Sequence, residues 1–164
     1  QRLLEQLPDK AGTPPIALHP YATHPDKAWK EAYWRQLMEL FESRGIPWIV
    51  IGRGNGMEGI PASRNFTNRT SLRETCALLK SSSLLITGDS GPMHLAGAVG
   101  TPVLALFGPT TEEWGFFPAG PKDRVLESQL DCRPCTLHGK KHCDRNHACM
   151  QSITPEQVMR ALDE

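Results

Sequence analysis

Short continuous runs of apolar residues alternate along the chain with longer segments in which apolar residues recur every three or four positions. The short runs predict buried strands at residues 15–20, 47–52, 83–87 and 101–107, with weaker candidates at 65–67 and 124–127. Strands that are apolar on both faces and separated by helices are typical of a parallel sheet with helices on both sides. The pattern therefore predicts a Rossmann-like α/β domain.

Two helices are expected in the first half of this domain. The first spans residues 28–44 and ends at Gly45, with an apolar stripe made by Trp29, Tyr33, Leu37, Leu40 and Phe41. The second begins after Ser71, which has capping-box spacing to Glu74, and its stripe is made by Leu72, Cys76 and Leu79.

Two further helices are expected in the second half. One starts near Pro92, a residue that suits a first helical turn, and runs to about Val99. The other closes the chain and opens on Thr154, Pro155 and Gln157. Residues 1–14 are polar and predict a short helical lead-in with a linker, which leaves residues 15–164 as the domain. Since the chain opens on Gln1, we expect it to be a piece of a longer protein.

Composition narrows the class of protein. The 164 residues include 18 Lys or Arg and 18 Asp or Glu, and 39% are hydrophobic, which fits one globular domain. A balanced charge argues against a nucleic-acid partner, because that affinity rests on excess positive charge. Apolar runs stay well short of the ~18 residues that a membrane-spanning helix needs.

A cysteine-rich loop at residues 131–150 stands apart from the α/β pattern. Cys132 and Cys135 have zinc-ribbon spacing, whereas Cys143 and Cys149 are further apart, and few apolar residues lie between the first and the last of them. A structural zinc ion would supply order to such a loop. Two disulfides and four free thiols are the alternatives.

Two loops follow predicted strands at the edge of the sheet where parallel α/β proteins bind ligands. The first, residues 19–29, carries the Thr23 hydroxyl and places Lys27 near a helix start. A cation there opposes the helix dipole, which indicates an anion between them, although a solvated lysine explains it as well. In the second, residues 88–100, Asp89, Ser90 and Gly91 could approach a ligand, and the first two are also good N-cap residues.

His94 lies in the first turn of the helix that follows the second loop. The rest of that helix is largely apolar, so a lone histidine there is either a core residue or a part of the ligand site.

The stretch GDSGPMHLAGAVGTPVLALFGPT, residues 88–110, closely resembles the signature segment of glycosyltransferase family 9, the lipopolysaccharide heptosyltransferases. HPYATHPDKAW is similar to that family's H-x-x-x-T-x-x-K-x-W loop, and NRTSLRETCALLK to the helix before its signature. The resemblance implies the carboxyl-terminal, donor-binding half of a two-domain GT-B glycosyltransferase, without a cofactor for transfer. The donor-binding residues that it implies are Thr23, Lys27, Glu58, Thr70, Ser71, Asp89, Ser90, Gly91, Pro92 and His94.

The implied reaction is inverting transfer of a heptose from a nucleotide-sugar, ADP-heptose, to a lipopolysaccharide core acceptor. Lys27 and the amide of Gly91 would stabilise the departing diphosphate, whereas the general base would come from an amino-terminal domain. Asp89 and His94 would position the donor. The family works on a lipid-linked saccharide acceptor in the cytoplasm, at the inner face of the inner membrane. A stand-alone nucleotide-sugar binding module without catalysis and a sugar-nucleotide epimerase are the alternatives.

Overall fold

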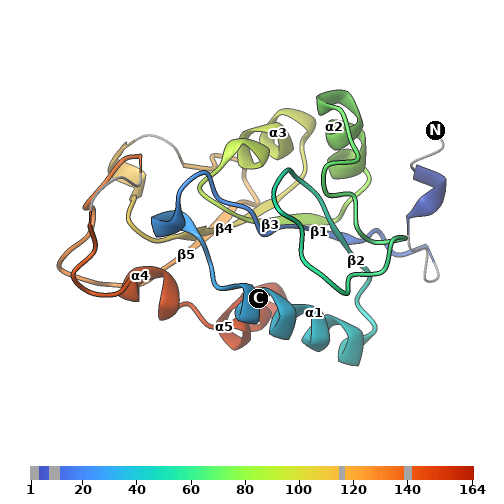
Figure 1. The fold of residues 1–164 in the computed structure, drawn as a ribbon. Coiled ribbons are helices and arrows are strands. Elements are labelled where there is room, and N and C mark those ends of the chain that lie inside the picture. Colours follow the sequence, from blue (N-terminus) through green and yellow to red (C-terminus); the bar gives the residue numbers. More distant parts are fainter. Residues whose placement is uncertain (1–3, 8–11, 115–116, 139–141) are drawn as a thin grey trace.

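In the computed structural model, residues 4–7, 12–114, 117–138 and 142–164 are described, and they form one parallel sheet between two layers of helices (Figure 1). The sheet order is β2-β1-β3-β4-β5. The strands are β1 (Ile16–His19), β2 (Trp48–Val50), β3 (Leu84–Gly88), β4 (Val103–Phe107) and β5 (Arg124–Glu127). This arrangement confirms the predicted Rossmann-like α/β fold.

The helices fall into two groups, one on each face of the sheet. On one face lie α1 (Glu31–Arg44), α4 (Ala148–Gln151) and α5 (Pro155–Asp163). On the other lie α2 (Leu72–Lys80) and α3 (Gly91–Val99). Three short 3₁₀ turns complete the order: η1 (Leu4–Gln6), η2 (Pro25–Lys27) and η3 (Glu112–Trp114).

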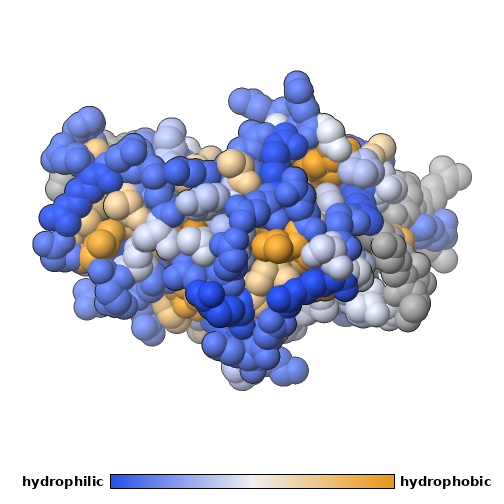
Figure 2. Space-filling model, turned by 90° about the horizontal axis from the view of Figure 1, so that it is seen from below, coloured by the Kyte–Doolittle hydropathy of each residue, from blue (hydrophilic) through white to orange (hydrophobic). Residues whose placement is uncertain are grey.

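Each face of the sheet has its own core, because successive side chains of a strand point to opposite sides. Leu18 packs with Trp34 and Phe41 of α1, whereas Ala17 packs with Leu79 of α2. All residues of β1 and β4 are buried, as expected for central parallel strands, and those of the edge strand β2 are buried as well. Figure 2 shows the outer face of the α1 layer, where hydrophilic side chains predominate and hydrophobic patches lie between them.

The first helix starts three residues later than predicted. η2 ends at Lys27, Ala28 is extended, and α1 begins only at Glu31. Trp29 is nonetheless buried, at 4% exposure, and its Nε1 donates to the carbonyl of Ile153 at 2.8 Å. A tertiary contact therefore explains the apolar residue at position 29, and the helical spacing from Trp29 was misleading.

The apolar stripe expected on α2 was wrong in part. The capping box of Ser71 and Glu74 is present, but Leu72 is 66% exposed and Cys76 is only partly buried. Thr75, Leu78 and Leu79 are the residues that α2 buries. The buried face of α2 is therefore rotated relative to the predicted one. Leu78 and Leu79 face the core, and Leu72 lies at the edge of a cavity.

Other boundaries were predicted closely. Gly45 ends α1 in the left-handed conformation, Pro92 lies in the first turn of α3, and Thr154 caps α5 through a capping box with Gln157. The weak strand candidate at 65–67 was wrong, since only a single parallel bridge joins Asn65 to Val50. Of the lead-in segment 1–14, η1 is helical, and residues 1–3 and 8–11 lie outside the described part.

Candidate functional site

The strand order predicts a ligand site at the carboxyl ends of β1 and β3. β1 pairs with β2 on one side and β3 on the other, so the connections after β1 and β3 diverge at their carboxyl ends. A cavity of about 550 Å³ lies at this point. Its lining residues are His19, Tyr21, Ala22, Thr23, Gly52, Arg53, Thr70, Leu72, Thr75, Ser90, Gly91, Pro92 and Leu95.

The floor of this cavity holds a neutral network of three side chains. His19 Nδ1 lies 3.1 Å from Thr87 Oγ1 and 3.2 Å from Ser90 Oγ, and the two hydroxyls are 2.9 Å apart. Burial lowers the pKa of His19 from 6.5 to about 4, so its imidazole is uncharged near neutral pH. Ser90 is the N-cap residue of α3, yet its side chain makes no capping bond and points to this network instead.

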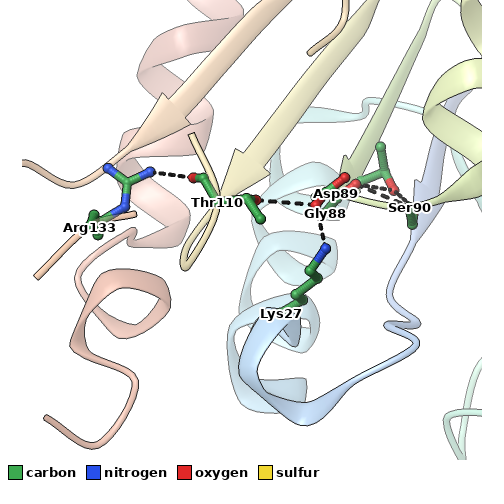
Figure 3. Close-up of polar contacts among 7 residues, drawn as sticks. Lys27, Gly88, Asp89, Ser90, Thr110 and Arg133 are labelled. Atoms are coloured by element: carbon green, nitrogen blue, oxygen red, sulfur yellow. Dashed lines mark hydrogen bonds and ion pairs between the residues drawn. The ribbon is translucent and has the colours of Figure 1, made fainter. Parts of the chain in front are cut away.

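A charged pair lies next to this network. Lys27 Nζ donates to Asp89 Oδ2 at 2.5 Å, and both side chains are only 11% exposed. The hydroxyl of Thr110 donates to the same carboxylate oxygen at 3.1 Å. Figure 3 shows Lys27 and Thr110 converging on Asp89 from η2 and from the end of β4. The counter-ion of Lys27 in this structure is therefore a protein carboxylate.

The predicted binding residues divide by their position at this cavity. Thr23, Thr70, Ser90, Gly91 and Pro92 line it. Lys27 and Asp89 adjoin it through the pair just described, whereas the remaining three have other surroundings.

Ser71, Glu58 and His94 lie away from the cavity lining. Ser71 caps α2. Glu58 is exposed, and its carbonyl accepts a hydrogen bond from Arg35 of α1 at 2.9 Å. His94 is exposed on α3, so the interpretation of His94 as a core residue was wrong.

Sequence reasoning assigned no binding role to three of the lining residues, His19, Tyr21 and Leu72. Tyr21 donates to or accepts from Thr67 Oγ1 at 2.7 Å and packs edge-on against His19. The glycine-rich turn after β2 carried a signal for this packing. Gly52 has a φ of 115°, and a Cβ there would lie 2.5 Å from His19 Cδ2, so only glycine lets the histidine approach.

The cysteine-rich segment, residues 131–150, forms a second cavity of about 240 Å³ on the α4 side of the sheet edge. All four of its cysteines line this cavity and none of them forms a disulfide, so the disulfide alternative is not what the structure contains. Within the described ranges, no three His, Cys, Asp or Glu side chains are grouped closely enough to hold a metal ion. Burial raises the pKa of the Cys149 thiol.

This segment is better anchored than its composition indicated. Cys149 and Met150 are buried in the α1-side core, at 7% and 1% exposure. A Cβ on Gly108 would lie 3.2 Å from Cys149 Sγ, which shows how closely the segment packs on the end of β4. Arg133, only 5% exposed, donates to the carbonyls of Ser128 and Thr110 at 2.5 and 2.9 Å. The signal that sequence analysis missed is Arg133 itself, because one guanidinium can bind several backbone carbonyls.

Comparison with known proteins identifies the family. The family model for glycosyltransferase family 9 (heptosyltransferase) matches residues 1–144. The chain is also 35% identical over 153 residues to lipopolysaccharide heptosyltransferase 1 of Pseudomonas aeruginosa, a match that covers 85% of this chain and 40% of that protein. The chain therefore belongs to glycosyltransferase family 9.

Solved structures share its fold. A structure of E. coli ADP-heptose lps heptosyltransferase II matches with a TM-score of 0.77 at 23% identity, over 99% of this chain and 49% of that chain. The iron-containing dodecameric glycosyltransferase TibC of enterotoxigenic E. coli matches with a TM-score of 0.74 at 24% identity, over 96% of this chain and 46% of that chain. The chain thus spans about half the length of these proteins, with the α/β fold of GT-B heptosyltransferases.

Among the helices of the described residues, none combines the length and the apolar character that crossing a bilayer requires.

Proposed function

We propose that residues 15–164 are the donor-binding domain of an inverting glycosyltransferase that transfers heptose from ADP-heptose to a lipopolysaccharide core acceptor. The observation that carries the proposal is the cavity at the divergence of β1 and β3, with the Lys27–Asp89 pair beside it, in a chain of this family. The structural likeness to E. coli ADP-heptose lps heptosyltransferase II supports the choice of donor.

The charges account for how this domain would promote transfer. Cleavage of the donor leaves an electron-poor sugar and a diphosphate whose negative charge grows in the transition state. Lys27 and the amide of Gly91, at the start of α3, would stabilise that charge more in the transition state than in the ground state. Asp89 keeps the Lys27 ammonium directed toward the end of β3, and His94 would contact the donor from α3.

The rest of the donor is assigned to the other lining residues. Thr23 would contact the diphosphate and Ser90 the sugar and phosphates, whereas Thr70 and Ser71 would lie near the nucleobase. Glu58 remains the candidate for the ribose and would need to approach from its exposed position in the turn after β2.

The acceptor and its general base belong to a second domain in this proposal. The chain alone would bind the donor and leave it unreacted. The complete enzyme would act in the cytoplasm, peripherally at the inner face of the inner membrane, on a lipid-linked saccharide.

A screen of nucleotide-sugars tests the proposal. Ligands that bind the native state raise the melting temperature by mass action, so ADP-sugars are expected to raise it more than UDP- or GDP-sugars. Lys27→Ala is expected to weaken ADP binding by about 1.5–3 kcal/mol, the range for hydrogen bonds to charged groups. The control is Lys30→Ala, an exposed lysine three residues away whose ammonium lies over the ring of Tyr33.

Two outcomes would overturn it. Equal shifts with all three nucleotide-sugars would remove the adenine specificity, and equal ADP affinity of Lys27→Ala and the parent would remove Lys27 from the site.

We also infer a structural zinc site at Cys132, Cys135, Cys143 and Cys149. Four thiols are a donor set that suits zinc, and all four face one cavity, although they would have to move closer together to bind one ion. Metal analysis of protein purified under reducing conditions is expected to give about one zinc per chain, and less after Cys132→Ser and Cys135→Ser. Titratable thiols at all four of these cysteines, without metal, would contradict the inference.

A further inference from the structure

The cysteine-rich segment reaches the Lys27–Asp89 pair from two sides, although the pair lies outside the cysteine cavity. One route runs through Arg133 to the carboxylate of Asp89. The other runs through His147 to the turn that carries Lys27.

The first route is a relay of hydrogen bonds. Arg133 Nη2 donates to the carbonyl of Thr110 at 2.9 Å, and the hydroxyl of Thr110 donates to Asp89 Oδ2 at 3.1 Å. Figure 3 shows Arg133, Thr110, Asp89 and Lys27 in this order. Arg133 also pairs with Glu127 Oε2 at 2.7 Å and donates to the carbonyl of Gly108, so its guanidinium is held on several sides. The position of Thr110 is therefore set by a residue of the cysteine-rich segment.

The second route depends on a buried carboxylate. Asp26 is 7% exposed and precedes Lys27 in η2. Its Oδ1 lies 2.7 Å from His147 Nε2, whereas its Oδ2 has no hydrogen-bond partner in the described part of the chain and lies 3.3 Å from His24 Nδ1. His147 is thus the main partner of this carboxylate, and its backbone N–H donates to Cys143 Sγ at 3.2 Å.

The turn itself is short, and its other hydrogen bonds lie within it, including one from Asp26 N to His24 Nδ1 at 3.3 Å. Lys27 N donates to the carbonyl of His24 and Ala28 N to that of Pro25, both at 3.0 Å. Displacement of Asp26 would move the adjoining Lys27 main chain, and with it the direction of the ammonium. A buried carboxylate that loses its partner is costly, so such displacement is the expected response.

We propose that Arg133 and His147 are positioning residues that fix the Lys27–Asp89 pair, so that the cysteine-rich segment sets the affinity of the donor site for the diphosphate. Neither residue lines the donor cavity, and both act through others. The inference rests on the proposed function, in which Lys27 binds the diphosphate of the nucleotide.

Calorimetric titration of ADP and adenosine into the chain tests it. His147→Ala is expected to weaken ADP binding about tenfold, within the range of coupling between sites, and to leave adenosine affinity unchanged. His147→Gln retains a side-chain donor and is expected to recover most of the ADP affinity. The matched control is His142→Ala, which removes a 90% exposed histidine from the same cavity.

Arg133→Lys tests the other route if His147→Ala does not fold. It retains the charge but cannot reach all the acceptors of the guanidinium, so the same ADP-selective loss is expected. Unchanged ADP affinity in the folded variant, or an equal loss for ADP and adenosine, would overturn the proposal.

A second measurement needs no nucleotide. Acylation of the Lys27 amine, followed by mass spectrometry, is expected to be several-fold faster in His147→Ala than in the parent, because the ion pair with Asp89 loosens. Lys30 labelling serves as the internal reference. If the parent fails to bind ADP, the proposed function fails, and the labelling rate alone decides the inference: an unchanged rate at Lys27 overturns it.

Discussion

Asp89 and Ser90 are neighbours in the sequence, but their side chains enter two different polar clusters. Ser90 joins His19 and Thr87 in a neutral network on the cavity floor. Asp89 joins Lys27 and Thr110 in a charged cluster beside the cavity. Both residues are good N-caps by type, yet α3 begins without a side-chain cap.

The difference shows what each cluster can offer a ligand. The neutral network has no formal charge near neutral pH, so it can shape the cavity without attracting ions. The charged cluster presents an ammonium that is already paired, so an incoming anion must share or displace Asp89. Removing one charge should therefore cost far more than removing one hydroxyl.

The largest effect is expected for Asp89→Ala. It leaves the Lys27 ammonium, 11% exposed, without its carboxylate, and removing one partner of a buried pair is strongly destabilising. Urea denaturation should show a loss of about 3 kcal/mol in the free energy of unfolding. The double variant Lys27→Met with Asp89→Ala removes both charges and should regain most of it. A single variant as stable as the parent would show that the pair is not the main constraint on this loop.

An intermediate effect is expected from protonation of His19. The pKa of His19 is about 4 in the native state, whereas an unperturbed histidine, as in the unfolded chain, has a pKa of 6.5. Between pH 4 and pH 6.5 the unfolded chain therefore binds a proton that the native state does not. Stability from this group is present above pH 6.5 and declines as the pH falls toward 4, by up to about 1.4 kcal/mol per pH unit. Urea denaturation from pH 7 to pH 5, a range over which this loss stays below that of Asp89→Ala, measures the slope. His19→Asn should flatten it, and an equal slope in the variant would assign the effect to other groups.

The smallest effect is expected for Ser90→Ala. The hydroxyl belongs to a neutral network in which Thr87 still faces His19 Nδ1, so the loss should be about 1 kcal/mol. The same denaturation experiment checks it. A loss as large as that of Asp89→Ala would mean that the neutral network, and not the ion pair, holds the loop together.

Much of the fold was predictable because its signals are local. Apolar runs marked the central strands, and glycine, proline and capping residues marked the ends of α1, α3 and α5. Trp29 and Leu72 were misassigned because their environments depend on distant residues. Trp29 is held by Ile153, 124 positions away, and Leu72 borders a cavity whose opposite wall comes from β1 and α3.

The site was predictable only as far as the loops that follow buried strands. The segment after β3 identified Ser90 and Gly91 as lining residues, and the glycine-rich turn after β2 was visible in the sequence. The partners of Lys27 and Asp26 were not, because each of these contacts joins residues far apart in the chain. A buried carboxylate or ammonium requires a partner, but nothing local in the sequence says which residue supplies it.

The packing of α5 against α1 has a consequence for the order in which the domain can fold during synthesis. The core beneath α2 and α3 has its last fully buried member at Phe107. The core beneath α1 also needs Met150, Ile153, Val158 and Met159, which a ribosome adds more than 40 residues after Phe107. Until then Trp34 and Phe41 lack part of their cover, and an unfinished apolar surface is prone to wrong contacts. One side of the sheet can therefore close early, whereas the side that anchors the cysteine-rich segment must wait for the final helix.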